Sequence, residues 1–241
     1  MTFFAVSVAL DMGRYMGWIN EEYGFWDAHK ITAANVPIEL GSVIADTDIT
    51  HTAQKRHRHD PDLSDFLVSF FKDEADTVAD FGCGNGSYLS ELHRSGIKCV
   101  GYDGNQETER HTNGLGKSLN LAKKIDVDVA DWILTLEVAE HIPKKYEEVF
   151  IDNVHRHNRK GVVISWAVKG QGGYGHFNEQ DNDYVKDLFC NLGYTNDMVT
   201  EKELREVCSL ERDKAVFWDE ATGWTLPCRY FVNTLMVFRK V

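Results

Sequence analysis

The pattern of hydrophobic and polar positions becomes regular at about residue 75. Before that point it predicts one clear helix, which Asp60 is suited to cap and in which Pro61 suits the first position. Apolar residues at helical spacing place one face of this helix against a core. These residues are Leu63, Phe66, Leu67, Phe70 and Phe71.

From Asp76 onward, short apolar runs alternate with amphipathic segments, which predicts strands separated by helices. The predicted strands cover residues 77–81, 98–102, 131–136, 161–166 and 231–238, and the predicted helices cover 87–94, 143–154 and 183–192. This order requires right-handed crossovers and predicts an α/β fold with a doubly wound, mostly parallel sheet. Ligands of such sheets bind at the carboxyl ends of the strands.

The chain divides into two parts on this pattern. Residues 1–74 are expected to form an N-terminal cap and substrate-side segment, and residues 75–241 the ligand-binding core. The length of 241 residues and the hydrophobic content of 43% suit one compact domain overall.

The composition narrows the possible partners. A net charge of −12 repels phosphate backbones, so no nucleic-acid partner is expected. No run is long and apolar enough to span a membrane, and the apolar run at residues 2–10 lacks the basic flank of a signal peptide. The five cysteines are scattered and form no C-x-x-C pair, which favours a reducing, cytoplasmic compartment over a disulfide framework.

Residues 80–86, D-F-G-C-G-N-G, follow the first strand of the regular region and precede a helix. Glycines suit this turn because it requires unusual dihedral angles and a close approach of a ligand. A dinucleotide loop reads G-x-G-x-x-G, whereas Ser87 occupies the place of the third glycine here. The carboxylate of Asp80 would oppose a pyrophosphate, but it suits the ammonium group of S-adenosylmethionine.

A second acidic residue, Asp103, closes the next strand, about 20 residues after the first glycine of the loop. A carboxylate at this position can accept hydrogen bonds from both hydroxyls of a ribose. Both NAD-binding and methyl-donor folds have this pair of features, and a structural loop with an incidental aspartate is the simpler alternative.

Two blocks of the sequence resemble the class I S-adenosylmethionine-dependent methyltransferases. The first is D-F-G-C-G-N-G followed by G-Y-D-G-N, and the second is D-W-I-L-T-L-E-V-A-E-H-I-P at residues 131–143. The second block is similar to a segment of many small-molecule methyltransferases, including those of the ubiquinone pathway. The resemblance covers roughly residues 76–193 and implies a seven-stranded, Rossmann-like methyltransferase fold.

The resemblance also implies roles for individual residues. Asp80 and the three loop glycines would hold the methionine end of the cofactor, Asp103 the ribose, and Glu137 would line the methyl-donor pocket. The implied cofactor-binding residues are Asp80, Gly82, Gly84, Gly86, Asp103, Gly104, Asn105, Asn120, Leu121 and Glu137. Asn120 departs from the family, which often has an aspartate beside the adenine, although an amide can still pair with the base.

Two histidines are candidate catalytic bases for an acceptor that starts protonated. His141 lies in E-H-I-P, where the resemblance places it facing the site, and the alternative is a residue that packs at the start of a helix. His176 lies in the loop 169–178, which contains four glycines and follows a strand. Such a loop favours a mobile lid or a close ligand approach over a flexible surface turn.

Candidate acceptor-binding residues come from two segments. Tyr23, Trp26 and His29 are expected to fold over the substrate, by analogy with the added segments of small methyltransferases, and packing is the alternative for each. Trp166 and Tyr174, at the start of the glycine-rich loop and within it, are the other candidates.

No metal site is predicted, because the pairs His57–His59 and His155–His157 have a spacing that does not converge on one helix face. The predicted activity is methyl transfer from S-adenosylmethionine, with S-adenosylhomocysteine as product, to an oxygen or nitrogen of a small-molecule acceptor. A catalytically silent cofactor-binding partner subunit is the alternative. An NAD-dependent oxidoreductase is disfavoured by the loop spacing and by Asp80.

Overall fold

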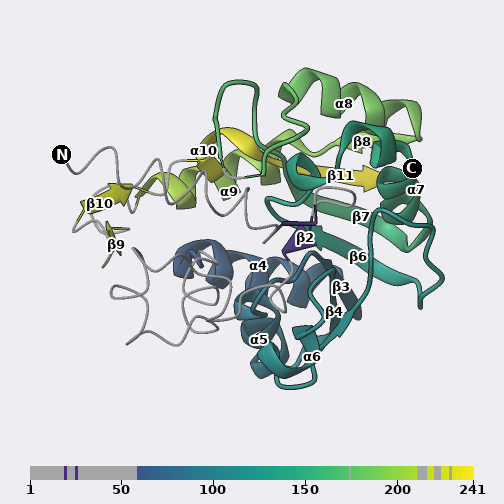
Figure 1. Ribbon diagram of the computed structural model, residues 1–241, viewed down its shortest axis with the longest axis vertical. Coiled ribbons are helices and arrows are strands. Elements are labelled where there is room, and N and C mark those ends of the chain that lie inside the picture. Colours follow the sequence, from purple (N-terminus) through teal and green to yellow (C-terminus); the bar gives the residue numbers. More distant parts are fainter. Residues whose placement is uncertain are drawn as a thin grey trace, which may run out of the picture.

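The computed structural model describes residues 59–173, 175–210 and 230–241, together with four short strands at 19–20, 25–26, 216–219 and 224–227. In the described part of the chain, helices cover both faces of a central sheet (Figure 1). No helix in these ranges is long and apolar enough to cross a membrane.

The central sheet has seven strands in the order β5-β4-β3-β6-β7-β11-β8. These strands are β3 (Thr77–Phe81), β4 (Lys98–Asp103), β5 (Gly116–Ser118), β6 (Ala130–Thr135), β7 (Asn158–Ser165), β8 (Tyr194–Asn196) and β11 (Leu235–Lys240). Strand β11 runs antiparallel to both of its neighbours, and the other paired strands of the sheet are parallel. The prediction of an α/β fold with a doubly wound, mostly parallel seven-stranded sheet is therefore confirmed.

The remaining elements are helices and two small antiparallel hairpins. The helices are α4 (Pro61–Glu74), α5 (Ser87–Arg94), α6 (Thr108–His111), α7 (Glu147–Arg156), α8 (Asn182–Asn191), α9 (Met198–Leu210) and α10 (Tyr230–Thr234), with 3₁₀ helices η3 (Ala139–His141) and η4 (Lys144–Tyr146). The hairpins pair β1 (Ile19–Asn20) with β2 (Phe25–Trp26) and β9 (Val216–Asp219) with β10 (Trp224–Pro227).

The central strands are buried on both faces, because alternate residues of a strand point to opposite sides of the sheet. On β3, Val78 belongs to a core cluster with residues of α4, α5 and α9. The next residue, Ala79, belongs to a second cluster with residues of α7 and α8. With both faces covered, the strand ends and the loops after them are the places where a ligand can bind.

Helix α4 forms as the sequence predicts. The side chain of Asp60 accepts a hydrogen bond from the Leu63 amide at 3.1 Å, and Pro61 is the first helical residue. Leu67 and Phe71 pack into the same cluster as Val78, so this helix covers the sheet although it precedes residue 75. The division at residues 74 and 75 stays a prediction.

Some elements differ from the prediction. The C-terminal apolar run does not begin as a strand, because residues 230–234 form α10 and place Phe231 in the core beside α9. The segment after Pro143 begins as η4 and becomes α-helical only at Glu147. Strands β5 and β8 were not predicted, because three residues are too few to show an alternating pattern. Helix α9 was also missed; its fully buried apolar stripe is narrow, with Leu204 and Cys208.

Candidate active site

The candidate site lies where strands β3, β4 and β6 end. These three strands are neighbours in the sheet and run parallel, so the loops that follow them emerge at the same edge. Strand β7 is parallel to β6 and brings the glycine-rich loop 169–178 to this edge as well. Residues from four separate parts of the sequence therefore meet at one end of the sheet.

The loop after β3 has a conformation that requires glycine. Gly82, Gly84 and Gly86 have φ angles of 89°, 54° and 75°, in the left-handed region that side chains disfavour. A Cβ atom at Gly82 would lie 2.2 Å from Cγ2 of Val138. The glycine loop therefore packs directly against the segment that follows β6.

Asp103 connects the two loops on this side of the site. Its Oδ2 accepts a hydrogen bond from the Gly84 amide at 2.9 Å, and its Oδ1 accepts one from the Asn105 amide at 2.9 Å. The Asn105 side chain in turn accepts a hydrogen bond from the Glu107 amide at 2.9 Å. Asp103, Gly104 and Asn105 are each partly exposed, so the carboxylate is fixed in position but remains accessible.

Asp80 is a buried carboxyl group beneath the glycine loop, with 4% of its surface exposed. Burial and the nearby charge of Asp103 raise the pKa of Asp80 to about 8. A positively charged group on a ligand would stabilise the ionised form of both carboxyls. The residues present thus fit a ligand that carries an ammonium group and a ribose, as S-adenosylmethionine does.

The segment expected beside the adenine is held by a residue that the sequence did not single out. Asn153, on α7, donates hydrogen bonds to the carbonyls of Leu121 at 3.0 Å and Lys123 at 2.7 Å. Leu121 is 5% exposed, and the Asn120 side chain accepts a hydrogen bond from the Ala122 amide at 2.9 Å. The signal for Asn153 is a polar residue on the apolar face of a predicted helix.

Glu137 follows β6 in a strained conformation, with a φ angle of 53°. Its amide donates to the Ser165 hydroxyl at 2.7 Å, and its carboxylate accepts hydrogen bonds from Gln171 at 3.2 Å and Thr234 at 3.3 Å. Burial raises the pKa of Glu137. Its contacts join the ends of β6 and β7 to the glycine-rich loop, and its position beside the methyl donor stays a prediction.

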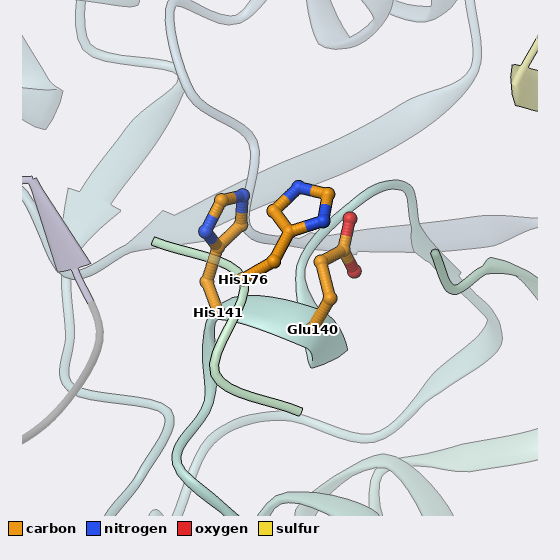
Figure 2. A group of neighbouring side chains, drawn as sticks. All are labelled: Glu140, His141 and His176. Atoms are coloured by element: carbon orange, nitrogen blue, oxygen red, sulfur yellow. The ribbon is translucent and has the colours of Figure 1, made fainter. Parts of the chain in front are cut away.

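The two candidate bases lie together although they are far apart in the sequence. The ring centroids of His141 and His176 are 5.0 Å apart, and the rings meet edge to face (Figure 2). Nδ1 of His141 lies 3.0 Å from the carbonyl oxygen of Gly175, and Nδ1 of His176 lies 3.0 Å from Oε1 of Glu179. A carbonyl or carboxylate oxygen can accept a hydrogen bond but cannot donate one. In a neutral imidazole, these contacts therefore place the proton on Nδ1 of each ring.

Glu140 completes this group and was missed as a site residue. It is fully buried, and neither of its carboxylate oxygens makes a hydrogen bond of good geometry among the described residues; its neighbours are the backbone amides of Glu140 itself and Ala167 and the acidic side chain of Glu137. Burial and the charge of Glu137 raise the pKa of Glu140 well above its ordinary value. A buried carboxyl group without a positively charged partner is costly, which is typical of a position that serves a ligand.

The glycine-rich loop is bound closely to the rest of the site. The carboxylate of Glu179 accepts hydrogen bonds from the amides of Gly170 at 2.8 Å and Gly172 at 2.7 Å. The backbone carbonyl of Glu140 accepts hydrogen bonds from the amides at positions 177 and 178, at 2.8 and 3.0 Å. Glu179 therefore organises both the loop and His176, and the mobile lid stays a prediction.

Of the five candidate acceptor-binding side chains, the structure describes one, Trp166. Trp166 is fully buried, and its ring nitrogen donates to the Asn178 carbonyl at 2.6 Å. Its ring offers no surface to an acceptor in this structure; its contacts support the glycine-rich loop instead. Tyr23, His29 and Tyr174 lie outside the described residues, and the side chain of Trp26 is likewise not described.

The family model described as "Methyltransferase domain" matches residues 55–168. No curated protein has a sequence that matches the chain.

Solved structures with a similar fold include two methyltransferases and the protein TehB. Magnesium protoporphyrin IX methyltransferase from Synechocystis PCC 6803, with bound SAH, is 13% identical, with a TM-score of 0.54 over 83% of this chain and 97% of that chain. TehB from Haemophilus influenzae is 14% identical, with a TM-score of 0.52 over 73% of this chain and 62% of that one. The small RNA methyltransferase HEN1 is 14% identical, with a TM-score of 0.51 over 77% of this chain and 27% of that one. At these identities the likeness shows a shared fold.

Proposed function

We propose that the chain is a class I S-adenosylmethionine-dependent methyltransferase and that it methylates an oxygen or nitrogen atom of a small-molecule acceptor. The expected cofactor is supported by the family match and by a similar fold that holds SAH. The NAD-dependent alternative lacks support, since the loop spacing and Asp80 both disfavour a pyrophosphate.

The observation that carries the proposal is the arrangement of two carboxyl groups around a glycine loop. Asp80 is buried at the end of β3, and Asp103 closes β4 with its oxygens fixed by two backbone amides. We assign Asp80 and the loop glycines to the methionine end of the cofactor, and Asp103 to its ribose. Gly104, Asn105, Asn120 and Leu121 are assigned to the adenosine.

The acceptor side is proposed to lie beyond Val138, on the opposite side from Gly82. When bound, S-adenosylmethionine supplies a methyl group on sulfur: the acceptor lone pair bonds to the methyl carbon, and the carbon–sulfur electrons remain on sulfur. The chain itself aligns the acceptor and excludes water. His141 and His176 are the residues proposed to act on an acceptor proton.

A small molecule is the acceptor class that fits the charge of the chain. The net charge of −12 disfavours a nucleic-acid phosphate backbone. We also expect a cytoplasmic location, on the basis of the scattered cysteines.

Product formation in a metabolite extract tests the proposal. The protein would be incubated with S-adenosylmethionine that carries a trideuterated methyl group, and mass spectrometry would search for metabolites that gain this group. We expect labelled products with the wild-type protein and with the Asp187→Ala control, an exposed position on α8. The Asp103→Ala protein should form almost none. Tight binding of S-adenosylhomocysteine without a labelled product in any extract would instead favour the silent partner subunit.

A further inference from the structure

Three side chains at the candidate site are arranged as ligands for one cation. Glu140, His141 and His176 each offer one ligand atom, and these atoms all lie within 4.8 Å of one another. Figure 2 shows the three side chains projecting side by side, from η3 and from the loop after β7. Ligands bound to one cation at about 2.1 Å lie up to ~4.2 Å apart, so small side-chain rotations would bring all three into contact with it.

The residues behind the two histidines orient them for this role. His141 donates from Nδ1 to the carbonyl of Gly175, and His176 donates from Nδ1 to the carboxylate of Glu179, each at 3.0 Å. This leaves the lone pair of each neutral ring on Nε2. Metal-binding histidines commonly donate their other nitrogen to a carboxylate or a carbonyl, which sets the tautomer and the direction of the ring.

Gly173 leaves the metal-binding edge of His176 open. A Cβ atom at Gly173 would lie 2.2 Å from Nε2 of His176 and 2.4 and 2.6 Å from the two adjacent ring carbons. These similar distances place Gly173 over the face of the ring and not in its plane. The lone pair on Nε2, which lies in the ring plane, is therefore not covered by this residue.

The carboxylate of Glu140 gives an independent reason to expect a cation. It is fully buried, its oxygens make no hydrogen bond of good geometry, and no positively charged side chain pairs with it in the described part of the chain. Burial of an unpaired carboxylate is unfavourable, whereas coordination of a cation compensates for the lost water. The imidazoles of His141 and His176 lie next to it, each held by its own hydrogen-bond acceptor. One cation bound by all three side chains is the simplest explanation of this arrangement.

We propose that Glu140, His141 and His176 bind a divalent transition-metal ion. Two imidazoles and a carboxylate suit Mn²⁺, Fe²⁺, Co²⁺ or Zn²⁺, whereas Mg²⁺ and Ca²⁺ prefer oxygen ligands alone. Three protein ligands leave further coordination positions of the ion open, as in catalytic metal sites.

The position of this site indicates what the ion does, and this step rests on the proposed function. Val138 contacts the glycine loop and is two residues from Glu140 in the sequence. An ion at the site would thus lie beside the methyl-donor pocket, where it would hold an oxygen atom of the acceptor. The expected acceptor group is therefore a hydroxyl or another oxygen and not an amine.

Direct metal binding tests the proposal without any assay of turnover. Protein freed of metal with a chelator would be titrated calorimetrically with MnCl₂ and CoCl₂, and bound Co²⁺ would be followed by its visible absorption. We expect one ion per chain. Glu140→Gln and His176→Ala should weaken binding by more than about 100-fold, and Glu179→Gln by about 10- to 100-fold, as for loss of a supporting partner. Gly173→Ala should also weaken binding, because it displaces the His176 ring without removing a ligand.

Matched controls and a second titration make the outcome decisive. Glu148→Gln and His93→Ala change exposed residues of the same types and should bind the ion like the wild-type protein. Absence of binding by the wild-type protein, or equal binding by Glu140→Gln and His176→Ala, would overturn the proposal. Titration of the metal-free protein with S-adenosylhomocysteine separates a failure of metal binding from a failure of the proposed function. The residues assigned to the methyl donor, such as Asp80 and Asp103, are not among the proposed metal ligands.

Discussion

Two groups of charged residues at opposite edges of the sheet are built in different ways. At the edge where the parallel strands begin, Arg239 donates to both oxygens of Glu74, at 2.9 and 3.1 Å, and to Asp197 at 2.7 Å. Its guanidinium carbon also lies 5.3 Å from the ring centroid of Trp132. At the edge where the strands end, the carboxylate of Glu140 has no such partner in the described part of the chain.

The difference separates a structural role from a binding role. The Arg239 group connects α4, β11 and the residue before α9, and its charges are paired within the protein. The hydrogen bonds that Arg239 donates to Glu74 and Asp197 raise the pKa of Arg239, so it stays charged at any ordinary pH. The group where the strands end has buried carboxyls without a positively charged partner among the described residues, and a cationic ligand would stabilise their ionised forms. Changes at the first group should therefore affect stability, and changes at the second should affect binding and turnover.

The largest expected effect is on turnover when His176 is removed. His176→Ala should lower the rate of methyl transfer by roughly 100- to 10,000-fold, whether the ring acts as a base or as a metal ligand. Affinity for S-adenosylhomocysteine should change little, because the ring lies on the acceptor side. Rates of labelled-product formation and calorimetric affinities measure the two effects. If both fall together, the loop serves the cofactor and not the acceptor.

Asp103→Ala should remove most of the cofactor affinity while the fold remains intact. Loss of two charge-assisted hydrogen bonds to a ribose costs roughly 3 kcal/mol or more, equivalent to at least about 100-fold in affinity. Calorimetry with S-adenosylhomocysteine gives the affinity, circular dichroism reports the fold, and Asp187→Ala is the control. Unchanged affinity would show that the ribose binds elsewhere.

Arg239→Ala should show the reverse pattern. It leaves Glu74 and Asp197 without their partner, and the free energy of unfolding should fall by about 1–3 kcal/mol, since the group is only partly buried. Urea denaturation measures this change, with Arg94→Ala, an exposed arginine of α5, as the control. Affinity for S-adenosylhomocysteine should stay within about twofold of wild type. A stability loss no larger than that of the control would remove the contrast between the two groups.

At Asp80 the expected effect is confined to one pH window. The folded protein without ligand holds a proton on this residue up to about pH 8, whereas an unperturbed aspartate has a pKa of 3.8. Unfolding therefore releases a proton between these values, and stability falls as pH rises through this window. Asp80→Asn lacks this dependence, so its stability relative to wild type should increase from pH 5 to pH 8 by at least about 1 kcal/mol. If the difference in the free energy of unfolding between Asp80→Asn and wild type is the same at pH 5 and pH 8, the burial of a protonated Asp80 would be contradicted.

The sequence predicted the parts of the fold whose signals are local. Strand β3 and helix α5 have the predicted bounds, because a buried apolar run and an amphipathic stretch each show their own period. Strands β5 and β8 are too short for such a period. The helical start of the C-terminal run depends on the packing of Phe231 against α9, which is a tertiary contact that no local pattern contains.

The candidate site shows the same limit. Asp80, the loop glycines and Asp103 could be found because they lie in contiguous motifs at the ends of neighbouring strands. His141 and His176 could be named singly, but their contact depends on the pairing of β6 with β7. Rules for metal sites based on neighbouring histidines could not find a group that the sheet assembles from distant residues. The roles of Glu179 and Asn153 also depend on contacts across the fold.

Calorimetric titration of the wild-type protein with S-adenosylhomocysteine and with NAD tests the central claim most directly. The glycine loop with Asp80 and Asp103 is proposed to bind a methyl donor, so we predict saturable binding of S-adenosylhomocysteine, one molecule per chain, and no binding of NAD. Binding of NAD without binding of S-adenosylhomocysteine would contradict the account.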